Sequence, residues 1–171
     1  MLRASSVILV VVLFCGAIAF PQSSLGTQSL AGTWKLNLEK SKYRKDDPGS
    51  TPQSATMVIR QIENGVNVMV SALIQGEEHH VQFDLVFDGK DRPVLGAPRN
   101  SEFGFGDPMK DTVSAKKLDR RTFLVTRKQS DMPVSTQKIV LSADGRSRTS
   151  YWKSKNEKGE PIDWVSVFDK Q

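Results

Sequence analysis

The sequence predicts an all-β protein, an antiparallel up-and-down β-barrel of about 8–10 strands. After residue 30, nearly every segment alternates apolar and polar residues with period two, which is typical of strands with one buried face. The connections between these segments are short, which suits antiparallel neighbours because parallel strands need long crossovers. A flat sheet of this many strands would expose its edges, whereas closure into a barrel removes them. A β-sandwich stays open as the alternative, since alternation alone does not separate the two architectures.

The first strands are recognised by their alternation and by the turns that follow them. The first strand lies within 30–43 and begins with a Gly-x-Trp. The next two strands are joined by Asn64-Gly65, which predicts a hairpin with a type I′ turn, in which both central residues have positive φ. A reversal at Gln75-Gly76 leads to the clearest strand, whose inward face is expected to comprise Val81, Phe83, Leu85 and Phe87.

The second half of the chain continues the pattern. Pro93 limits the segment after the clearest strand to a short edge strand. No stretch of the mature chain shows the 3.6-residue apolar spacing of a long amphipathic helix. Further strands are expected at about 111–118, 122–129, 134–141, 146–154 and 161–169, with reversals at Asp119-Arg120, Asp131-Met132-Pro133, Asp144-Gly145 and Lys158-Gly159.

The N-terminal residues have the pattern of a secretory signal peptide. A short basic start precedes an apolar run from Val7 to Ile18, and the small residues Ala17 and Ala19 predict cleavage before Phe20. The run is shorter than the roughly 20 residues of a transmembrane helix, so no transmembrane segment is expected in the mature chain. We therefore expect a periplasmic or secreted protein. The chain divides into a signal peptide (1–19), a flexible N-terminal segment (20–29) and one domain (30–171).

Composition limits the chemistry of the mature chain. The single cysteine, Cys15, lies in the signal peptide, so neither disulfides nor thiol chemistry is expected after cleavage. The full chain has a formal net charge of +5, and removal of Arg3 with the signal peptide leaves a modestly basic protein that weakly favours acidic partners, such as an anionic component of the cell envelope; export argues against nucleic acid. No nucleophile elbow, zinc-binding helix or phosphate loop occurs. We predict no enzymatic activity, no metal and no cofactor.

Several stretches resemble a known superfamily. The segment Gly32–Leu36 resembles the first strand of the calycins, the lipocalins and fatty-acid-binding proteins, in which the tryptophan plugs one end of the barrel. The whole mature chain resembles a group of uncharacterised exported bacterial proteins with lipocalin-like domains, to which no reaction is assigned. The stretches that carry this resemblance are GTWKLNLEKSKY (32–43), FDGKDRPVLGAP (87–98), DTVSAKKLD (111–119), LSADGRSRT (141–149) and VFDKQ (167–171).

The chain also departs from the fatty-acid-binding proteins. Their Arg-x-Tyr pair, which grips a carboxylate near the chain end, is replaced here by the strand Trp164–Phe168. Their helical lid has no counterpart, because 40–53 is too short and too rich in proline, glycine and aspartate. The resemblance therefore implies a barrel fold without naming a ligand.

Aromatic residues and one histidine are the candidates for a ligand site. Trp34 is expected mainly as a buried plug, and His79 is expected to face inward while His80 faces out beside Glu78. The pair of histidines faces opposite sides of a strand, so it cannot share one metal ion. The long glycine-rich loop 96–110 is expected to cap the cavity or to touch a partner. The full set of candidate ligand-binding residues is Trp34, His79, Phe83, Phe87, Phe103, Phe105, Trp152 and Trp164.

Two functions are consistent with these features. In the first, the barrel encloses a cavity that binds a small apolar or amphiphilic molecule, with Val113 and Ala115 leaving space inside. In the second, the barrel is filled, and the protein acts as an interaction or structural protein of the envelope through its long loop and a basic outer face. The basic outer face is expected to comprise Lys116, Lys117, Arg120, Arg121, Arg127, Lys128, Lys153 and Lys155.

Overall fold

The computed structural model describes residues 29–43, 51–94, 111–155 and 159–171. Within these ranges the chain forms ten strands and no helix. No helix in this part of the chain has the length and apolarity needed to cross a membrane. The strands are β1 (Gly32–Leu36), β2 (Ser54–Ile62), β3 (Gly65–Ile74), β4 (Glu77–Val86), β5 (Arg92–Pro93), β6 (Asp111–Lys117), β7 (Thr122–Gln129), β8 (Met132–Leu141), β9 (Ser147–Lys155) and β10 (Pro161–Lys170).

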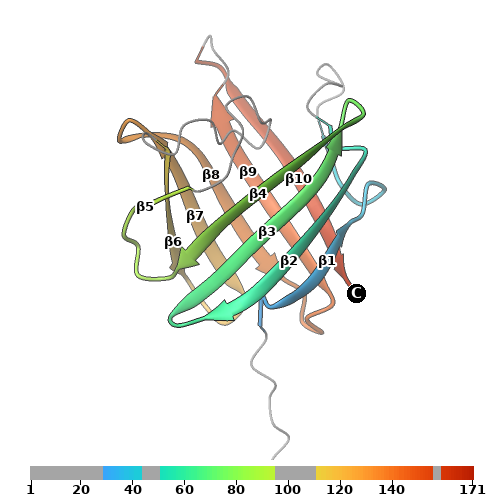
Figure 1. Cartoon of the computed structure of the whole chain (residues 1–171), viewed down its shortest axis with the longest axis horizontal. Coiled ribbons are helices and arrows are strands. Elements are labelled where there is room, and N and C mark those ends of the chain that lie inside the picture. Colours follow the sequence, from blue (N-terminus) through green and yellow to red (C-terminus); the bar gives the residue numbers. More distant parts are fainter. Residues whose placement is uncertain (1–28, 44–50, 95–110, 156–158) are drawn as a thin grey trace, which may run out of the picture.

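All ten strands belong to one antiparallel sheet that curls into a barrel (Figure 1). The order is β4-β3-β2-β1-β10-β9-β8-β7-β6-β5, so the sheet is up-and-down except where the first strand meets the last. At that point Trp34 pairs with Lys170 and Leu36 pairs with Phe168. The predicted barrel is confirmed, and the single continuous sheet excludes the β-sandwich.

The barrel is nearly closed rather than fully closed. The two ends of the sheet meet where β4 approaches β6. The two-residue strand β5 pairs only with Thr112 and Val113, near the start of β6. An isolated bridge between Asp88 and Lys116 joins the two sides there. The amide of Gly89 also donates a hydrogen bond to the carbonyl of Ala115 at 2.9 Å. Pro93 thus lies in a short edge strand, as the sequence predicted.

The hairpin at Asn64-Gly65 is present, but its turn differs from the prediction. Ile62 pairs with Gly65, so the loop consists of Glu63 and Asn64. Asn64 has a left-handed φ of 58°, whereas Gly65 does not have a positive φ. The type I′ prediction was therefore wrong. Gly65 is instead required by space, because a Cβ there would overlap the carbonyl oxygen of Leu85 on the neighbouring strand.

Trp34 lies in the apolar core on β1, opposite Lys170 of β10. Its side chain is fully buried, and its indole Nε1 donates a hydrogen bond to the carbonyl of Leu30 at 2.8 Å. The ammonium group of Lys170 lies 5.1 Å from the ring centroid, which is a cation–π distance. These contacts satisfy the polar atom of the indole and cover its face. Trp34 is thus buried, as the sequence predicted, and it belongs to the apolar core between the strands, while its role as a plug at one end of the barrel stays a prediction.

Candidate functional site

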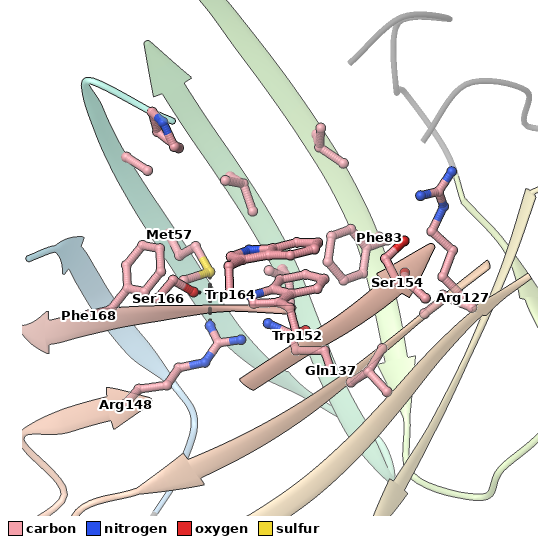
Figure 2. Close-up of a pocket in the computed structure, with 18 of the residues that line it drawn as sticks. Met57, Phe83, Arg127, Gln137, Arg148, Trp152, Ser154, Trp164, Ser166 and Phe168 are labelled. Atoms are coloured by element: carbon pink, nitrogen blue, oxygen red, sulfur yellow. Dashed lines mark hydrogen bonds between the residues drawn. The ribbon is translucent and has the colours of Figure 1, made fainter. Parts of the chain in front are cut away.

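A cavity of about 290 Å³ lies inside the barrel (Figure 2). This volume is near the lower end of the range for small-molecule sites. One wall of the cavity is apolar and comes from β2, β3 and β4, with Met57, Val68, Val70, Val81, Phe83 and Leu85. The facing wall, from β8, β9 and β10, carries polar side chains, among them Ser135, Gln137, Arg148, Ser154 and Ser166. The cavity is therefore chemically two-sided.

The polar wall follows from the period-two geometry of β9. Arg148, Ser150, Trp152 and Ser154 alternate with residues that face outward, such as Tyr151, which is 47% exposed. Because side chains at i, i+2 and i+4 share one face of a strand, the inward face of β9 carries polar groups along its whole length. Only Trp152 on this face is a large apolar side chain.

Two tryptophans form an aromatic platform in the cavity wall. Trp152 on β9 and Trp164 on β10 are directly opposite each other in the ladder, and their rings stack with centroids 5.2 Å apart and planes only 7° from parallel. Figure 2 shows the stack beside Phe83. The pairing predicted from the sequence is thus present. A flat aromatic surface of this size favours contact with apolar or planar parts of a ligand.

A short chain of hydrogen bonds supports this platform. The indole Nε1 of Trp152 donates to the hydroxyl oxygen of Ser166 at 3.1 Å. Ser166 is also hydrogen-bonded to the phenol of Tyr43. Burial raises the pKa of Tyr43 to about 12, and the bond to Ser166 opposes this effect only in part. Tyr43 therefore stays a neutral hydroxyl at physiological pH, and it presents a polar atom at the edge of an apolar space.

Arg148 is the most unusual residue of the cavity. Its side chain is 4% exposed and lies on the inward face of β9, next to Phe168 on β10. The guanidinium carbon is 5.9 Å from the centroid of the Phe168 ring, and Nη1 donates a hydrogen bond to the thioether sulfur of Met57 at 2.9 Å. Burial lowers the pKa of Arg148 to about 10, so it remains charged at neutral pH.

A second arginine lies on the other side of the tryptophan pair. Arg127 on β7 lines the cavity with a side chain that is 17% exposed. It forms an ion pair of 3.7 Å with Asp111 on β6, whose side chain is 1% exposed. Burial lowers the pKa of Arg127, and the Asp111 carboxylate opposes that shift. Figure 2 shows Arg127 and Arg148 at opposite ends of the drawn site.

The position of Arg127 corrects one expectation from the sequence. The sequence predicts Arg127 on a solvated basic outer face, whereas in the structure it lines the cavity. Regular alternation explains this position, because Arg127 continues the inward face of β7 that carries Phe123 and Val125, and it pairs with the buried Val113 on β6. Lys128 pairs with Asp91 at 2.7 Å, and Lys117 lies 5.8 Å from the ring of Phe123. The basic residues thus serve several local contacts.

Three of the predicted site residues line the cavity, namely Phe83, Trp152 and Trp164. Three others are described but are not among the lining residues. Trp34 is fully buried in the core, His79 is half-buried on β4, and Phe87 packs against Phe123 with ring centroids 5.0 Å apart. Phe103 and Phe105, together with the loop 96–110, lie outside the described residues. A direct ligand contact of these five residues stays a prediction.

The histidines form no metal centre with other residues that the structure describes. His80 Nε2 lies 3.6 Å from a carboxylate oxygen of Glu78, and its Nδ1 lies 3.0 Å from the hydroxyl of Ser71. All three side chains are exposed. No group of three or more histidine, cysteine, aspartate or glutamate side chains in the described ranges could hold a metal ion.

The fold is an antiparallel up-and-down β-barrel similar to that of fatty-acid-binding proteins. Two of the similar solved structures are as follows. The zebrafish ileal bile-acid-binding protein complexed with cholic acid has a TM-score of 0.52 and 12% identity, covering 82% of this chain and 98% of that one. The Schistosoma mansoni fatty-acid-binding protein in complex with arachidonic acid has a TM-score of 0.51 and 12% identity, covering 86% and 98%.

These similarities show the fold alone, because the identities are low. No protein-family model and no curated protein matches the sequence.

Proposed function

We propose that this protein is an exported binding protein that holds one small apolar or amphiphilic molecule inside its barrel. The observation that carries the proposal is the two-sided cavity of about 290 Å³, with an apolar wall facing polar groups and a stacked tryptophan pair. An apolar lining with a few placed polar groups is typical of small-molecule sites. The two similar structures hold cholic acid and arachidonic acid, so barrels of this fold accept amphiphiles of different shape.

The cavity favours binding over the alternative of a filled barrel that works through its surface. A filled barrel would have its interior occupied by side chains at close-packed density. Here Val113 and Val125 line open space together with the larger aromatic groups. We propose a non-enzymatic role, because the polar groups of the cavity comprise hydroxyls, an amide and guanidinium groups without a nucleophile–base pair.

Export is part of the proposal and rests on the sequence of the first 19 residues. Expression of the full chain with its own N-terminus should yield a mature protein that begins at Phe20. Intact-mass measurement of the protein from the medium or the periplasm checks this. Recovery of the uncleaved chain from the cytoplasm would contradict it.

Binding is tested with N-phenylnaphthylamine, a neutral dye that fluoresces in apolar surroundings. We expect saturable binding by the purified protein, together with a small molecule in native mass spectra of protein from its own host. Phe83→Glu should weaken dye binding by about tenfold or more, because it places a charge in the apolar wall. Leu118→Glu is the matched control, since Leu118 is 55% exposed. Equal binding by both variants would place the dye outside the cavity and refute the proposal.

A further inference from the structure

Arg148 is a buried cation without an anionic partner among the described residues. No carboxylate of the described chain forms an ion pair with its guanidinium group, and the pKa of Arg148 is shifted by burial alone, without a contribution from a neighbouring charge. Its Nε is buried and has no hydrogen-bond partner. Buried charges in proteins are normally paired, because an unpaired one has lost its hydration without compensation.

The partner that Arg148 does have is weak. Nη1 donates to the sulfur of Met57, and a thioether is a poor acceptor compared with a carboxylate. The contact with Phe168 adds a cation–π interaction of modest strength. A guanidinium group has five N–H donors in a planar fork, so most of its capacity is unused by these contacts.

The surroundings of Arg148 offer further polar atoms but no negative charge. Ser150 follows on the same face of β9, is fully buried, and its hydroxyl has no hydrogen-bond partner. Ser166, which lines the cavity, is directly opposite Ser150 in the ladder. Unpaired donors on one face of a strand, beside an open cavity, are a suitable seat for an oxyanion.

The second arginine of the cavity, Arg127, already has a carboxylate partner. Arg127 is compensated by Asp111, so it adds no net charge at its end. Among the described residues that line the cavity, Arg148 is therefore the charged group for which no ion pair is seen. A single negative charge would neutralise it, whereas a dianion would leave a second charge uncompensated in an apolar space.

We propose that Arg148 binds the monoanionic head group of the ligand, a carboxylate or a sulfonate, and that the apolar body of the ligand lies along the tryptophan pair toward Arg127. This inference rests on the proposed function and names the chemical class of the molecule that the cavity holds. The head group exchanges the weak bond to Met57 for charge-assisted hydrogen bonds from the guanidinium group. Binding thus removes the unpaired charge of the empty protein.

A matched pair of dyes tests the proposal. Anilinonaphthalene sulfonate and N-phenylnaphthylamine share one aromatic body and differ by the sulfonate. The quantity to measure is the ratio of their dissociation constants in the wild-type protein, in Arg148→Met and in Arg148→Lys. We expect Arg148→Met to reduce the preference for the sulfonate by about tenfold or more, the magnitude of one lost charge-assisted hydrogen bond, and Arg148→Lys to retain part of it.

Arg146→Met is the control for net charge, because Arg146 is exposed and two residues away. It should leave the ratio unchanged. Displacement of the neutral dye by dodecanoate and by dodecanol extends the test to carboxylates. Dodecanoate should bind more tightly than dodecanol to the wild-type protein, and this difference in affinity should be lost in Arg148→Met. The neutral dye also reports that each variant still has its cavity.

The outcomes separate the two proposals. A ratio that is the same in Arg148→Met and in the wild type, with the neutral dye still bound, would overturn the role of Arg148 and leave the binding function intact. Failure of both dyes to bind the wild-type protein would overturn both. Loss of the sulfonate preference in Arg148→Met but not in Arg146→Met supports the anion seat.

Discussion

Replacing Arg148 by methionine is expected to stabilise the empty protein, although most substitutions at buried positions destabilise. The buried guanidinium group lacks a compensating charge among the described residues, and methionine has a similar length with no charge to desolvate. The prediction tests the unpaired charge directly and needs no ligand.

The magnitude follows from the pKa of Arg148. Burial lowers this pKa to about 10. Each pKa unit below the ordinary value of a guanidinium group corresponds to about 1.4 kcal/mol against the charged form, so the penalty is about 3 kcal/mol. The hydrogen bond to Met57 and the contact with Phe168 offset part of it, each by about 0.5–1 kcal/mol. We expect a net gain of about 1–2 kcal/mol in the free energy of unfolding.

The pH dependence has a defined sign. Arg148 is a base whose folded pKa is lowered, so the unfolded chain binds its proton more tightly. The penalty is complete at every pH below about 10, and it disappears only as the pH rises beyond that value. Arg148→Met should therefore be more stable than wild type by a constant amount from mildly acidic to mildly basic pH.

Urea unfolding followed by tryptophan fluorescence measures this gain. The m-value should stay the same, since the two proteins expose similar surface on unfolding. Arg146→Met should change the free energy of unfolding by less than about 0.5 kcal/mol, as expected for an exposed side chain. If Arg148→Met is instead less stable than wild type by about 1 kcal/mol or more, the guanidinium group is a net stabiliser and the reasoning fails.

Three further predictions concern a buried tryptophan, a hairpin glycine and a buried hydroxyl. Trp34→Ala should lower the free energy of unfolding by about 3–5 kcal/mol in urea titrations, because it removes a fully buried indole. Gly65→Ala should cost about 1–3 kcal/mol through overlap with Leu85, whereas Gly76→Ala, in open space at a φ of 83°, should cost about 1 kcal/mol from its backbone strain alone. Tyr43 has its pKa raised to about 12, so it contributes stability that is present below a pH of about 10 and is lost as the pH rises through about 12. Tyr43→Phe should remove that loss, and tyrosinate absorbance checks the titration directly.

A specific result would contradict each of these predictions. A cost below about 1 kcal/mol for Trp34→Ala would mean that the stability of the core does not depend on the indole. Equal costs for the two glycine variants would show that neighbouring backbone does not limit Gly65. A tyrosinate titration with the same midpoint in native and urea-unfolded protein would show that Tyr43 is accessible to water.

Much of the fold was predictable because period-two alternation and turn residues act locally. In the strand containing Val81 and Phe83, the other face is polar except for Val86 at its end, so the inward face could be assigned from the sequence. The pairing of Trp152 with Trp164 followed from a hairpin between neighbouring strands. The Asn64-Gly65 turn was misassigned because the glycine is required by a neighbouring strand, which the local sequence does not contain.

The polar half of the site was not predictable in the same way. On β9 both faces carry polar residues, so alternation divides the strand into two faces without showing which one points inward. Arg148 shares its face with Trp152, and this spacing was the only local signal that a charge lies inside. An arginine in a strand is ordinarily exposed, so the expectation from residue type alone is wrong at this position.

The pairing of β1 with β10 has a consequence for the order of folding. It joins residues such as Trp34 and Lys170 from distant positions in the chain, while every other ladder joins strands that are consecutive in sequence. Contacts of long sequence separation carry a large loss of chain entropy before they form. We expect the hairpins to assemble first and the ring to close last. Until it closes, the open sheet can pair with other copies of the chain, so refolding yield should fall as protein concentration rises.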